Sequence, residues 1–197
     1  MGGQRHISPE VEVNLSWVLA EQVIRSGYKP DIVLSLYRGG GKPAPAVVEA
    51  LREIAGWEFD DFPIKARRYD NSHNGGSNVI MWGISALPTP PIGRRVLLLD
   101  DIYDEGKTLR TAKEDIRAHY KPLDLELRVG VNIFKTGNDP EGERPDFYGM
   151  EIPGSVWVIQ TYEQESRWAD DLRDRLRHDG YSVKELPTPV GLAALRP

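Results

Sequence analysis

Apolar runs of strand length and amphipathic stretches of helical length alternate along this 197-residue chain. After Ser8-Pro9, a helix N-cap followed by a first-turn proline, apolar residues recur at helical spacing until Gly27 ends the run. Similar signals continue along the chain. They predict helices over about residues 9–26, 45–55, 106–119 and 168–179, and strands over 31–37, 57–65, 79–82, 95–100, 125–133 and 156–159.

Two of the predicted strands differ in the burial they imply. Val96–Leu99 is wholly apolar, which is typical of a parallel strand covered on both faces. Leu125–Ile133 alternates apolar with polar or glycine positions, which predicts one solvent-exposed face. The alternation of strands and helices indicates an α/β fold with a mostly parallel central sheet flanked by helices. In such sheets, ligands bind at the loops that follow the carboxyl ends of the strands.

Residues 69–78 are polar and rich in Gly, Asn and Ser, which predicts a mobile loop. We expect the last segment, 187–197, to be loosely held. No internal repeat or composition shift divides the sequence, so we expect a single domain over residues 1–197.

Composition and charge exclude several classes of protein. There are 25 Lys and Arg against 30 Asp and Glu, and the formal charge of −5 argues against a nucleic-acid or membrane partner. The absence of Cys excludes disulfide scaffolds, Cys-ligated metal sites and thiolate nucleophiles. No apolar run approaches the roughly 20 residues of a membrane span, and the N-terminus lacks the apolar stretch of a secretory signal. We therefore expect a soluble, cytoplasmic, globular protein.

The most informative segment begins where the wholly apolar strand ends. Asp100 and Asp101 stand there, and a predicted helix opens a few residues later. The backbone N–H groups of residues 105–108, at the helix N-terminus, would form an anion pocket suited to a phosphate monoester. Lys107 and Thr108 add a positive charge and a hydroxyl to that pocket.

The two carboxylates suit hydroxyl groups or a metal ion rather than the phosphate, because like charges repel. A phosphate held by amides with carboxylates beside it fits a phosphorylated sugar. Each acid taken alone could instead complement the helix dipole. The Gly106-Lys107-Thr108 run also invites a Walker interpretation, but that motif requires a glycine where this chain has Asp101. A nucleoside triphosphatase is therefore not expected.

Leu98–Thr108 resembles the phosphoribosyl-pyrophosphate signature of the type I phosphoribosyltransferases. Asp31–Gly40, Lys135 and Arg144–Pro153 are similar to the purine branch, the hypoxanthine-guanine and xanthine-guanine enzymes, and the similarity spans roughly residues 10–168. The resemblance implies the family's fold with a small hood region. It also implies transfer of the 5-phosphoribosyl group from phosphoribosyl pyrophosphate to hypoxanthine, guanine or xanthine, which gives a nucleoside 5′-monophosphate and pyrophosphate in purine salvage.

The resemblance assigns roles along the strand–helix segment. Asp104 matches the carboxylate near purine N7, the usual general-base candidate. Asp100 and Asp101 would accept the ribose hydroxyls directly or through Mg2+, and Glu163 falls where relatives help to hold a second Mg2+. The residues assigned to the 5′-phosphate are Glu105, Gly106, Lys107 and Thr108. Glu105 replaces a usual Thr, so its side chain must point away from the phosphate.

The remaining implied contacts concern the leaving group and the base. Tyr37-Arg38 matches a pair whose peptide bond is cis in relatives, and the 69–78 loop falls where they have a flap that excludes water. Lys135 would donate to the oxygen at purine position 6, Trp157 would stack on the base, and the Val158 backbone would read the ring edge. The pyrophosphate contacts would be Tyr37, Arg38, Gly39, Arg68, Tyr69 and Arg167.

Two alternatives come from other classes of protein. Gly39–Ala44 fits the G-x-G-x-x-A pattern of a dinucleotide-binding oxidoreductase, with Asp60 or Asp61 about twenty residues further on. The second alternative is a non-catalytic regulator of the same fold that senses nucleotides or binds RNA. Retention of Asp104 and Lys135 favours catalysis. As in relatives, we expect a homodimer or homotetramer.

Overall fold

The computed structural model describes residues 3–71, 76–88, 93–160, 167–180 and 182, without the side chains of 67–71, 76–78 and 167–170. The chain forms two compact units. The large unit comprises residues 10–154, and the small unit comprises residues 1–9 with 155–197. In the part of the chain that is described, no helix has the length and apolar character needed to cross a membrane.

The large unit is built on a six-stranded sheet in the order β4-β3-β2-β5-β6-β7. Every neighbouring pair is parallel except β3 with β4, which run antiparallel. The predicted α/β fold with a mostly parallel sheet is confirmed. The strands are β2 (Ile32–Tyr37), β3 (Asp60–Asn71), β4 (Gly76–Trp82), β5 (Arg95–Tyr103), β6 (Glu126–Thr136) and β7 (Phe147–Pro153).

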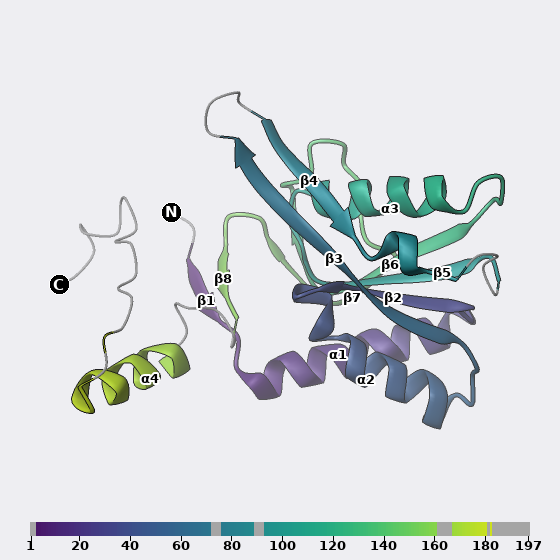
Figure 1. The fold of residues 1–197 in the computed structure, drawn as a ribbon. Coiled ribbons are helices and arrows are strands. Elements are labelled where there is room, and N and C mark those ends of the chain that lie inside the picture. The colour runs from purple at the N-terminus through teal and green to yellow at the C-terminus, as the bar shows by residue number, and fades with distance from the viewer. Residues whose placement is uncertain (1–2, 72–75, 89–92, 161–166, 181, 183–197) are drawn as a thin grey trace. The chain divides into compact units, whose positions relative to one another are not determined.

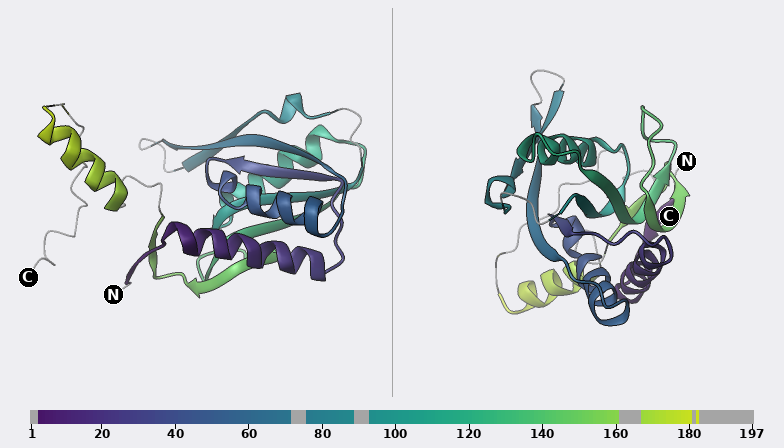
Figure 2. Two further views of the ribbon diagram at one scale, coloured as in Figure 1. Left: turned by 90° about the horizontal axis from the view of Figure 1, so that it is seen from below. Right: turned by 90° about the vertical axis from the view of Figure 1, so that its right-hand side faces the viewer.

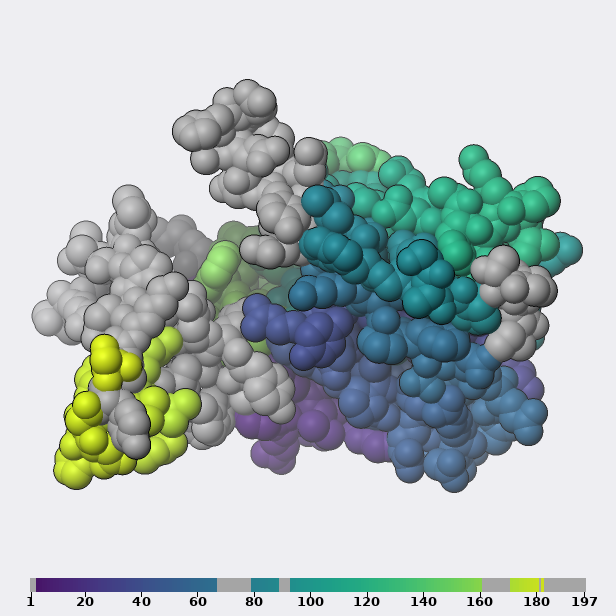
Figure 3. Space-filling view, in the orientation of Figure 1, coloured from purple at the N-terminus to yellow at the C-terminus, as the bar shows by residue number. Residues whose placement is uncertain are grey.

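Helices cover both faces of this sheet (Figure 1). One face carries α1 (Pro9–Arg25) and α2 (Ala44–Glu49), which lie side by side in the view from below (Figure 2). A π-helical turn, Ala50–Ile54, continues α2. The other face carries α3 (Lys107–His119), and the space-filling view shows α3 in green and the α2 region in blue on opposite sides (Figure 3).

The alternation of side chains along β5 divides the apolar core into two layers. Val96 and Leu98 pack in the cluster that includes Leu109 and Ile116 of α3. Their neighbours Leu97 and Leu99 pack in the cluster that includes residues of α1 and α2. Successive side chains of a strand point to opposite faces, so a strand buried on both faces must be apolar throughout. The predicted burial of this strand is confirmed.

The prediction of an exposed face for the next strand holds at Glu126, which is exposed, but is wrong from Val129 onward. Val129 to Lys135 of β6 are all buried, because β6 lies between β5 and β7 and helices cover the sheet. Two of the non-apolar positions, Gly130 and Asn132, face α1 instead of solvent. Asn132 donates from Nδ2 to Ser16 Oγ at 3.0 Å, and a Cβ at Gly130 would lie 3.2 Å from Leu19. The alternation therefore reflects close packing and a buried hydrogen bond.

The hairpin of β3 and β4 replaces part of the predicted loop. Residues 69–71 pair with residues 76–78, in a register that sets Tyr69 opposite Asn78 and Asn71 opposite Gly76. The prediction of a loop at these six positions was wrong, because backbone pairing outweighs their polar composition. The rest of the predicted mobile loop, residues 72–75, lies outside the described residues.

The small unit contains a two-stranded parallel sheet of β1 (Gln4–His6) and β8 (Trp157–Ile159). It also contains α4 (Arg167–His178), close to the predicted last helix. We did not predict β1, which is three residues long and carries no apolar side chain. The tail at 187–197 lies outside the described residues.

Candidate functional site

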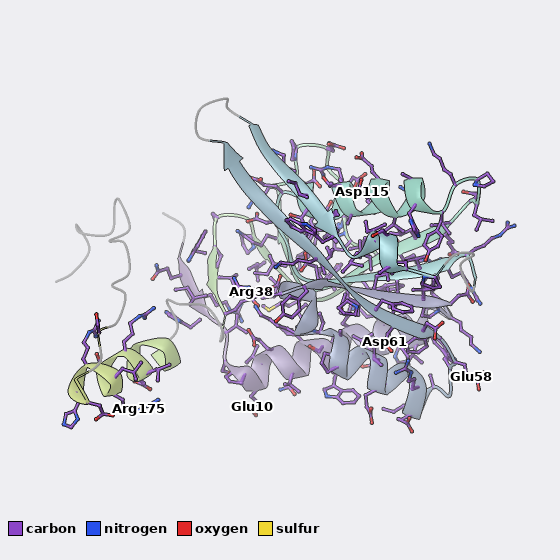
Figure 4. All side chains as sticks on the ribbon, viewed as in Figure 1. Glu10, Arg38, Glu58, Asp61, Asp115 and Arg175 are labelled. Carbon is purple, nitrogen blue, oxygen red and sulfur yellow. The ribbon has the colours of Figure 1, made fainter. Side chains whose placement is uncertain are left out.

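The order of the strands brings the segments that follow β2, β5 and β6, which carry the predicted site residues, to one edge of the sheet. β2, β5 and β6 are consecutive parallel strands, so their carboxyl ends meet there. Arg38 lies at the carboxyl end of β2, and Asp61 lies near the start of β3 at the opposite edge (Figure 4). The glycine turn after β2, the acids at the end of β5 and Lys135 near the end of β6 therefore share one edge of the sheet.

The turn after β2 packs directly on the acids of β5. A Cβ built at Gly39 would lie 2.5 Å from Asp100 Oδ1 and 2.4 Å from Asp101 Oδ1. A Cβ at Gly40 would lie 2.2 Å from the carbonyl oxygen of Leu99. These positions need glycine because the backbone lies too close to the carboxylates at Gly39, and to the Leu99 carbonyl at Gly40, for any side chain. The Tyr37-Arg38 peptide bond is cis, as the resemblance predicted.

Asp100 and Asp101 lie within β5, which continues to Tyr103 instead of ending at Asp100 as predicted. Loss of hydration around the Asp100 carboxyl, together with the negative charge of Asp101, raises the pKa of Asp100 well above its usual range. Lys42 Nζ donates to Asp101 Oδ2 at 2.9 Å and brings a cation to this pair. We did not predict Lys42 as a site residue, although it follows the glycine turn directly.

Asp104 connects β5 to β6 through its carboxylate. Lys135 Nζ donates to Asp104 Oδ2 at 2.8 Å, and Asn138 Nδ2 donates to Asp104 Oδ1. The Lys135 side chain is only 7% exposed, whereas that of Asp104 is 43% exposed. The predicted base-reading lysine and the predicted general base are thus in contact, and the carboxylate remains open to a ligand. Asn138 was missed because nothing in its sequence neighbourhood marks it.

The predicted phosphate turn leads into α3. Gly106 adopts a positive φ of 70° immediately before the helix starts at Lys107. The N–H of Arg110 donates to the Gly106 carbonyl at 2.9 Å, so the N–H groups before Arg110 precede the first helical hydrogen bond. Such a helix start is suited to an anion. Lys107 and Glu105 are exposed, and Thr108 is half-buried.

A buried polar cluster lies behind this turn. Asp139 Oδ2 accepts hydrogen bonds from Tyr103 Oη at 2.5 Å and from Arg110 Nη1 at 2.7 Å. Arg110 Nη2 donates to the carbonyl oxygen of Glu105 at 2.8 Å. Asp139, Arg110 and Tyr103 were not among the predicted site residues, because their charges and hydroxyl look like ordinary surface or core groups in the sequence.

The other predicted site residues lie either outside the described residues or in the small unit. The side chains of Arg68, Tyr69 and Arg167, and all of Glu163, lie outside the described residues. Trp157 and Val158 belong to β8 of the small unit, where Trp157 is 59% exposed and Val158 is buried.

Comparison with known proteins places these features in a family. The phosphoribosyl transferase domain family matches residues 16–164, three-quarters of the chain. The chain belongs to this family. The resemblance drawn from the sequence is thus confirmed, and the turn at Gly106 and the acids of β5 lie inside the matched residues.

Individual relatives in the family are distant. The chain is 27% identical over 160 residues to hypoxanthine-guanine phosphoribosyltransferase from Bos taurus, a match that covers 78% of this chain and 64% of that protein. It is also 27% identical over 139 residues to the bifunctional protein PyrR from Geobacter sp. (strain M21). That match covers 70% of this chain and 77% of PyrR. The chain therefore spans less than two thirds of the mammalian phosphoribosyltransferase.

Solved structures share the fold of the chain. A purine phosphoribosyltransferase from Pyrococcus horikoshii Ot3 has a TM-score of 0.61 and 22% identity, over 81% of this chain and 94% of that chain. The Helicobacter pylori xanthine-guanine-hypoxanthine phosphoribosyltransferase has a TM-score of 0.61 and 19% identity, over 87% of this chain and 99% of that chain. At these identities the likeness establishes the type of fold alone.

Proposed function

We propose that this protein transfers the 5-phosphoribosyl group from phosphoribosyl pyrophosphate to an oxopurine base, which gives a nucleoside 5′-monophosphate and pyrophosphate. The observation that carries the proposal is the contact of Asp104 with Lys135, directly before the turn at Gly106 that opens α3. A carboxylate and a turn suited to phosphate in one short segment, with a buried ammonium from the neighbouring strand β6, match the needs of a base that attacks a phosphorylated sugar.

In the proposed reaction, the base reaches the sugar at the open side of Asp104. N9 of the purine forms a bond to the anomeric carbon as the bond from that carbon to the pyrophosphate oxygen breaks, and pyrophosphate leaves with the electron pair. Asp104 accepts the proton that the purine loses at N7. Lys135 donates a hydrogen bond to the oxygen at position 6, which an adenine does not carry.

The sugar and its metal ion are assigned to the end of β5. Asp100 and Asp101 supply hard oxygen ligands, as Mg2+ requires, and the close approach of Gly39 leaves no side chain over them. Among the described residues, no three His, Asp or Glu side chains form a complete metal site. Proteins commonly hold Mg2+ by one or two carboxylates together with substrate oxygens. Mg2+ would neutralise charge on the pyrophosphate.

The remaining assignments come from the family resemblance. We assign the 5′-phosphate to Glu105, Gly106, Lys107 and Thr108, and the pyrophosphate to Tyr37, Arg38, Gly39, Arg68, Tyr69 and Arg167. Trp157 and Val158 complete the base site, and Glu163 adds a metal ligand. A homodimeric or homotetrameric state and a cytoplasmic location stay predictions.

The test is a panel of free purine and pyrimidine bases incubated with phosphoribosyl pyrophosphate and Mg2+, with released pyrophosphate measured. We expect release with hypoxanthine, guanine or xanthine and little release with adenine. Release with pyrimidines alone, or with no base in the panel, contradicts the proposal. An Asp104→Asn variant serves as the control for contaminating activity in the same preparation.

A nucleotide-sensing regulator of the same fold is the second candidate. The match to PyrR, a protein that its name calls bifunctional, is compatible with a role besides transfer. That match covers 77% of PyrR, whereas the match to the mammalian enzyme covers 64% of that enzyme. The same panel separates the two candidates. A regulator would bind nucleoside monophosphates, measured by calorimetry, and release no pyrophosphate.

A further inference from the structure

Asp139 is a buried carboxylate for which the reaction proposed above has no direct use. Its side chain is 4% exposed, and it belongs to the connection between β6 and β7. Beyond the bonds from Tyr103 and Arg110, its Oδ1 accepts the N–H of Glu141 at 2.8 Å. Burial by itself raises the pKa of Asp139, but these three hydrogen bonds outweigh it and lower the pKa, so the group is a carboxylate at neutral pH.

Arg110 carries the effect of Asp139 to the phosphate turn. Its guanidinium is rigid and planar, and all three of its nitrogens are engaged. Nη1 binds Asp139, Nε lies 3.1 Å from Glu141 Oε1, and Nη2 donates to the carbonyl oxygen of Glu105 at 2.8 Å. Asp139 therefore fixes the plane of a group that itself fixes a backbone carbonyl of the turn.

The turn also packs directly against the cluster of Asp139, Tyr103 and Arg110. A Cβ at Gly106 would lie 2.5 Å from Asp139 Oδ2, 2.5 Å from Tyr103 Oη and 2.7 Å from Arg110 Nη1. Because the peptide unit is planar and trans, a Glu105 carbonyl that points toward Arg110 leaves the N–H of Gly106 pointing the opposite way. The cluster thus sets the direction of the Gly106 N–H, one of the N–H groups of the predicted anion pocket.

We propose that Asp139 is a positioning residue for phosphate binding. Through Arg110 and Tyr103 it holds the Glu105-Gly106 peptide so that the N–H groups at the start of α3 are oriented for a phosphate monoester before the ligand arrives. The inference rests on the proposed function in taking that ligand to be the 5′-phosphate of a ribose. Asp139 does not touch the ligand, and its contribution lies in preorganisation.

The direct test measures binding of ribose 5-phosphate by calorimetry, without base or pyrophosphate. We expect Asp139→Asn to bind about tenfold more weakly than the wild type, the effect of roughly one charge-assisted hydrogen bond. Tyr103→Phe removes one donor to Asp139 and keeps the ring that packs edge-on against Phe134, so we expect a smaller loss in the same direction. Far-ultraviolet circular dichroism and thermal melting identify folded variants.

Lys113→Met is the matched control. Lys113 Nζ lies 2.8 Å from Glu143 Oε2, so this pair joins the same helix to the same β6–β7 connection through Glu143 in place of Asp139. We expect its affinity for ribose 5-phosphate to equal that of the wild type. An equal loss in Lys113→Met and Asp139→Asn would overturn the proposal, because it would show a general loosening of the connection.

Kinetics give a second readout. In the variants of the cluster, we expect the KM for phosphoribosyl pyrophosphate to rise by the same factor as the dissociation constant of ribose 5-phosphate, and the KM for the base to stay unchanged. A folded Tyr103→Phe and a folded Asp139→Asn that both bind ribose 5-phosphate as the wild type does would refute the inference. If the wild type binds ribose 5-phosphate in an Asp139-dependent way but releases no pyrophosphate with any base, the proposed function fails and the inference stands.

Discussion

Lys135 and Asp104 form an ion pair between the ends of two adjacent parallel strands, with the ammonium 2.8 Å from Asp104 Oδ2. The two side chains differ in exposure, since Lys135 is covered and Asp104 is open on one side. A buried ammonium needs such a partner, because an unpaired buried charge is strongly destabilising. The pair therefore holds Lys135 in place while it leaves Asp104 accessible to a base.

Asp104→Asn keeps the shape of the side chain and removes its ability to accept a proton. We expect kcat for transfer to an oxopurine to fall by about 10²–10⁴-fold, the usual contribution of a general base. Affinity for the nucleoside monophosphate, measured by calorimetry, should be largely retained. Asp115→Asn, on the exposed side of α3, is the control and should keep full activity (Figure 4). An undiminished rate in Asp104→Asn would remove the general-base assignment.

Lys135→Ala removes the donor assigned to the oxygen at purine position 6. The ratio of kcat/KM for oxopurine to kcat/KM for adenine should fall about tenfold or more, because the lost hydrogen bond favoured only the oxopurine. The measurement compares both bases in the variant, in the wild type and in Lys113→Ala, which removes a different ion pair, the one with Glu143. An unchanged ratio counts against the proposed role of Lys135, even if the overall rate falls.

Gly39→Ala tests the close packing of the turn on the acids. Its Cβ would fall within 2.5 Å of the oxygens of Asp100 and Asp101, so the turn or the carboxylates must move. We expect stability to fall by about 1–3 kcal/mol, as in other overpacked sites, together with a large loss of transfer activity. Gly41→Ala is the matched control, since its Cβ would meet only the Tyr37 ring at 3.6 Å. Equal melting temperatures for the two variants would contradict this prediction.

Asp100→Asn should stabilise the protein at neutral pH while it removes activity. The folded pKa of Asp100 is raised by lost hydration and by Asp101. In the unfolded chain the carboxyl has a pKa of about 3.9, so the folded protein holds the Asp100 proton more tightly than the unfolded chain does. The wild type therefore loses stability as pH rises from about 3.9 through the folded pKa. The advantage of Asp100→Asn should therefore grow with pH and reach roughly 0.5–2 kcal/mol.

The measurement is denaturant unfolding of Asp100→Asn and the wild type between pH 4.5 and 8, a range set by the ordinary carboxyl pKa of about 3.9. A stability difference that does not change with pH would show that Asp100 is not the titrating group. Activity of the folded variant should be lost at every pH in this range.

Asp31 stabilises the opposite edge of the sheet. Its carboxylate accepts the N–H of Arg94 and of Arg95 and pairs with Arg95 Nη2 at 2.8 Å. The hydrogen bond from the Arg95 side chain lowers the pKa of Asp31, and the bonds from the backbone N–H groups lower it further. Partial burial opposes this effect but does not cancel it. Asp31→Asn should therefore cost about 1–3 kcal/mol of stability at pH 7.

The cost of Asp31→Asn should shrink as pH falls below the unfolded pKa of about 3.9 and through the lowered folded pKa, because the wild type then loses the same interaction. Its transfer kinetics should match those of the wild type. Asp61→Asn breaks an exposed pair with Arg52 and should cost less than about 1 kcal/mol. An equal cost for both substitutions would show that burial of the Asp31 pair contributes nothing.

The sequence alone predicted the features that depend on local pattern. The apolar run before Asp100 predicted a buried strand, the alternation of elements predicted the parallel sheet, and Gly106 marked the turn into α3. The order of residues from Leu98 to Thr108 predicted the family, because it joins a strand, two acids and a helix start in a fixed spacing. These signals are short in range and do not require knowledge of which strands are neighbours.

The features that were missed depend on contacts between distant segments. Lys42 reaches Asp101 across 59 positions in the sequence, and Asn138 reaches Asp104 across 34. Asn132 looks like a solvent-facing residue in the alternation of its strand, but it forms a buried hydrogen bond with α1. A single polar residue carries no local signal of its partner, so only the folded sheet reveals these contacts.

The length of α3 has a practical consequence for handling the protein. The helix starts at Lys107 beside the turn at Gly106, and its 13 residues carry the chain about 20 Å away before it ends at His119. Lys121 is exposed just beyond that end. A dye or a solid support attached at position 121 would lie one helix length from the turn at Gly106, so the proposed transfer could be tested on an immobilised sample.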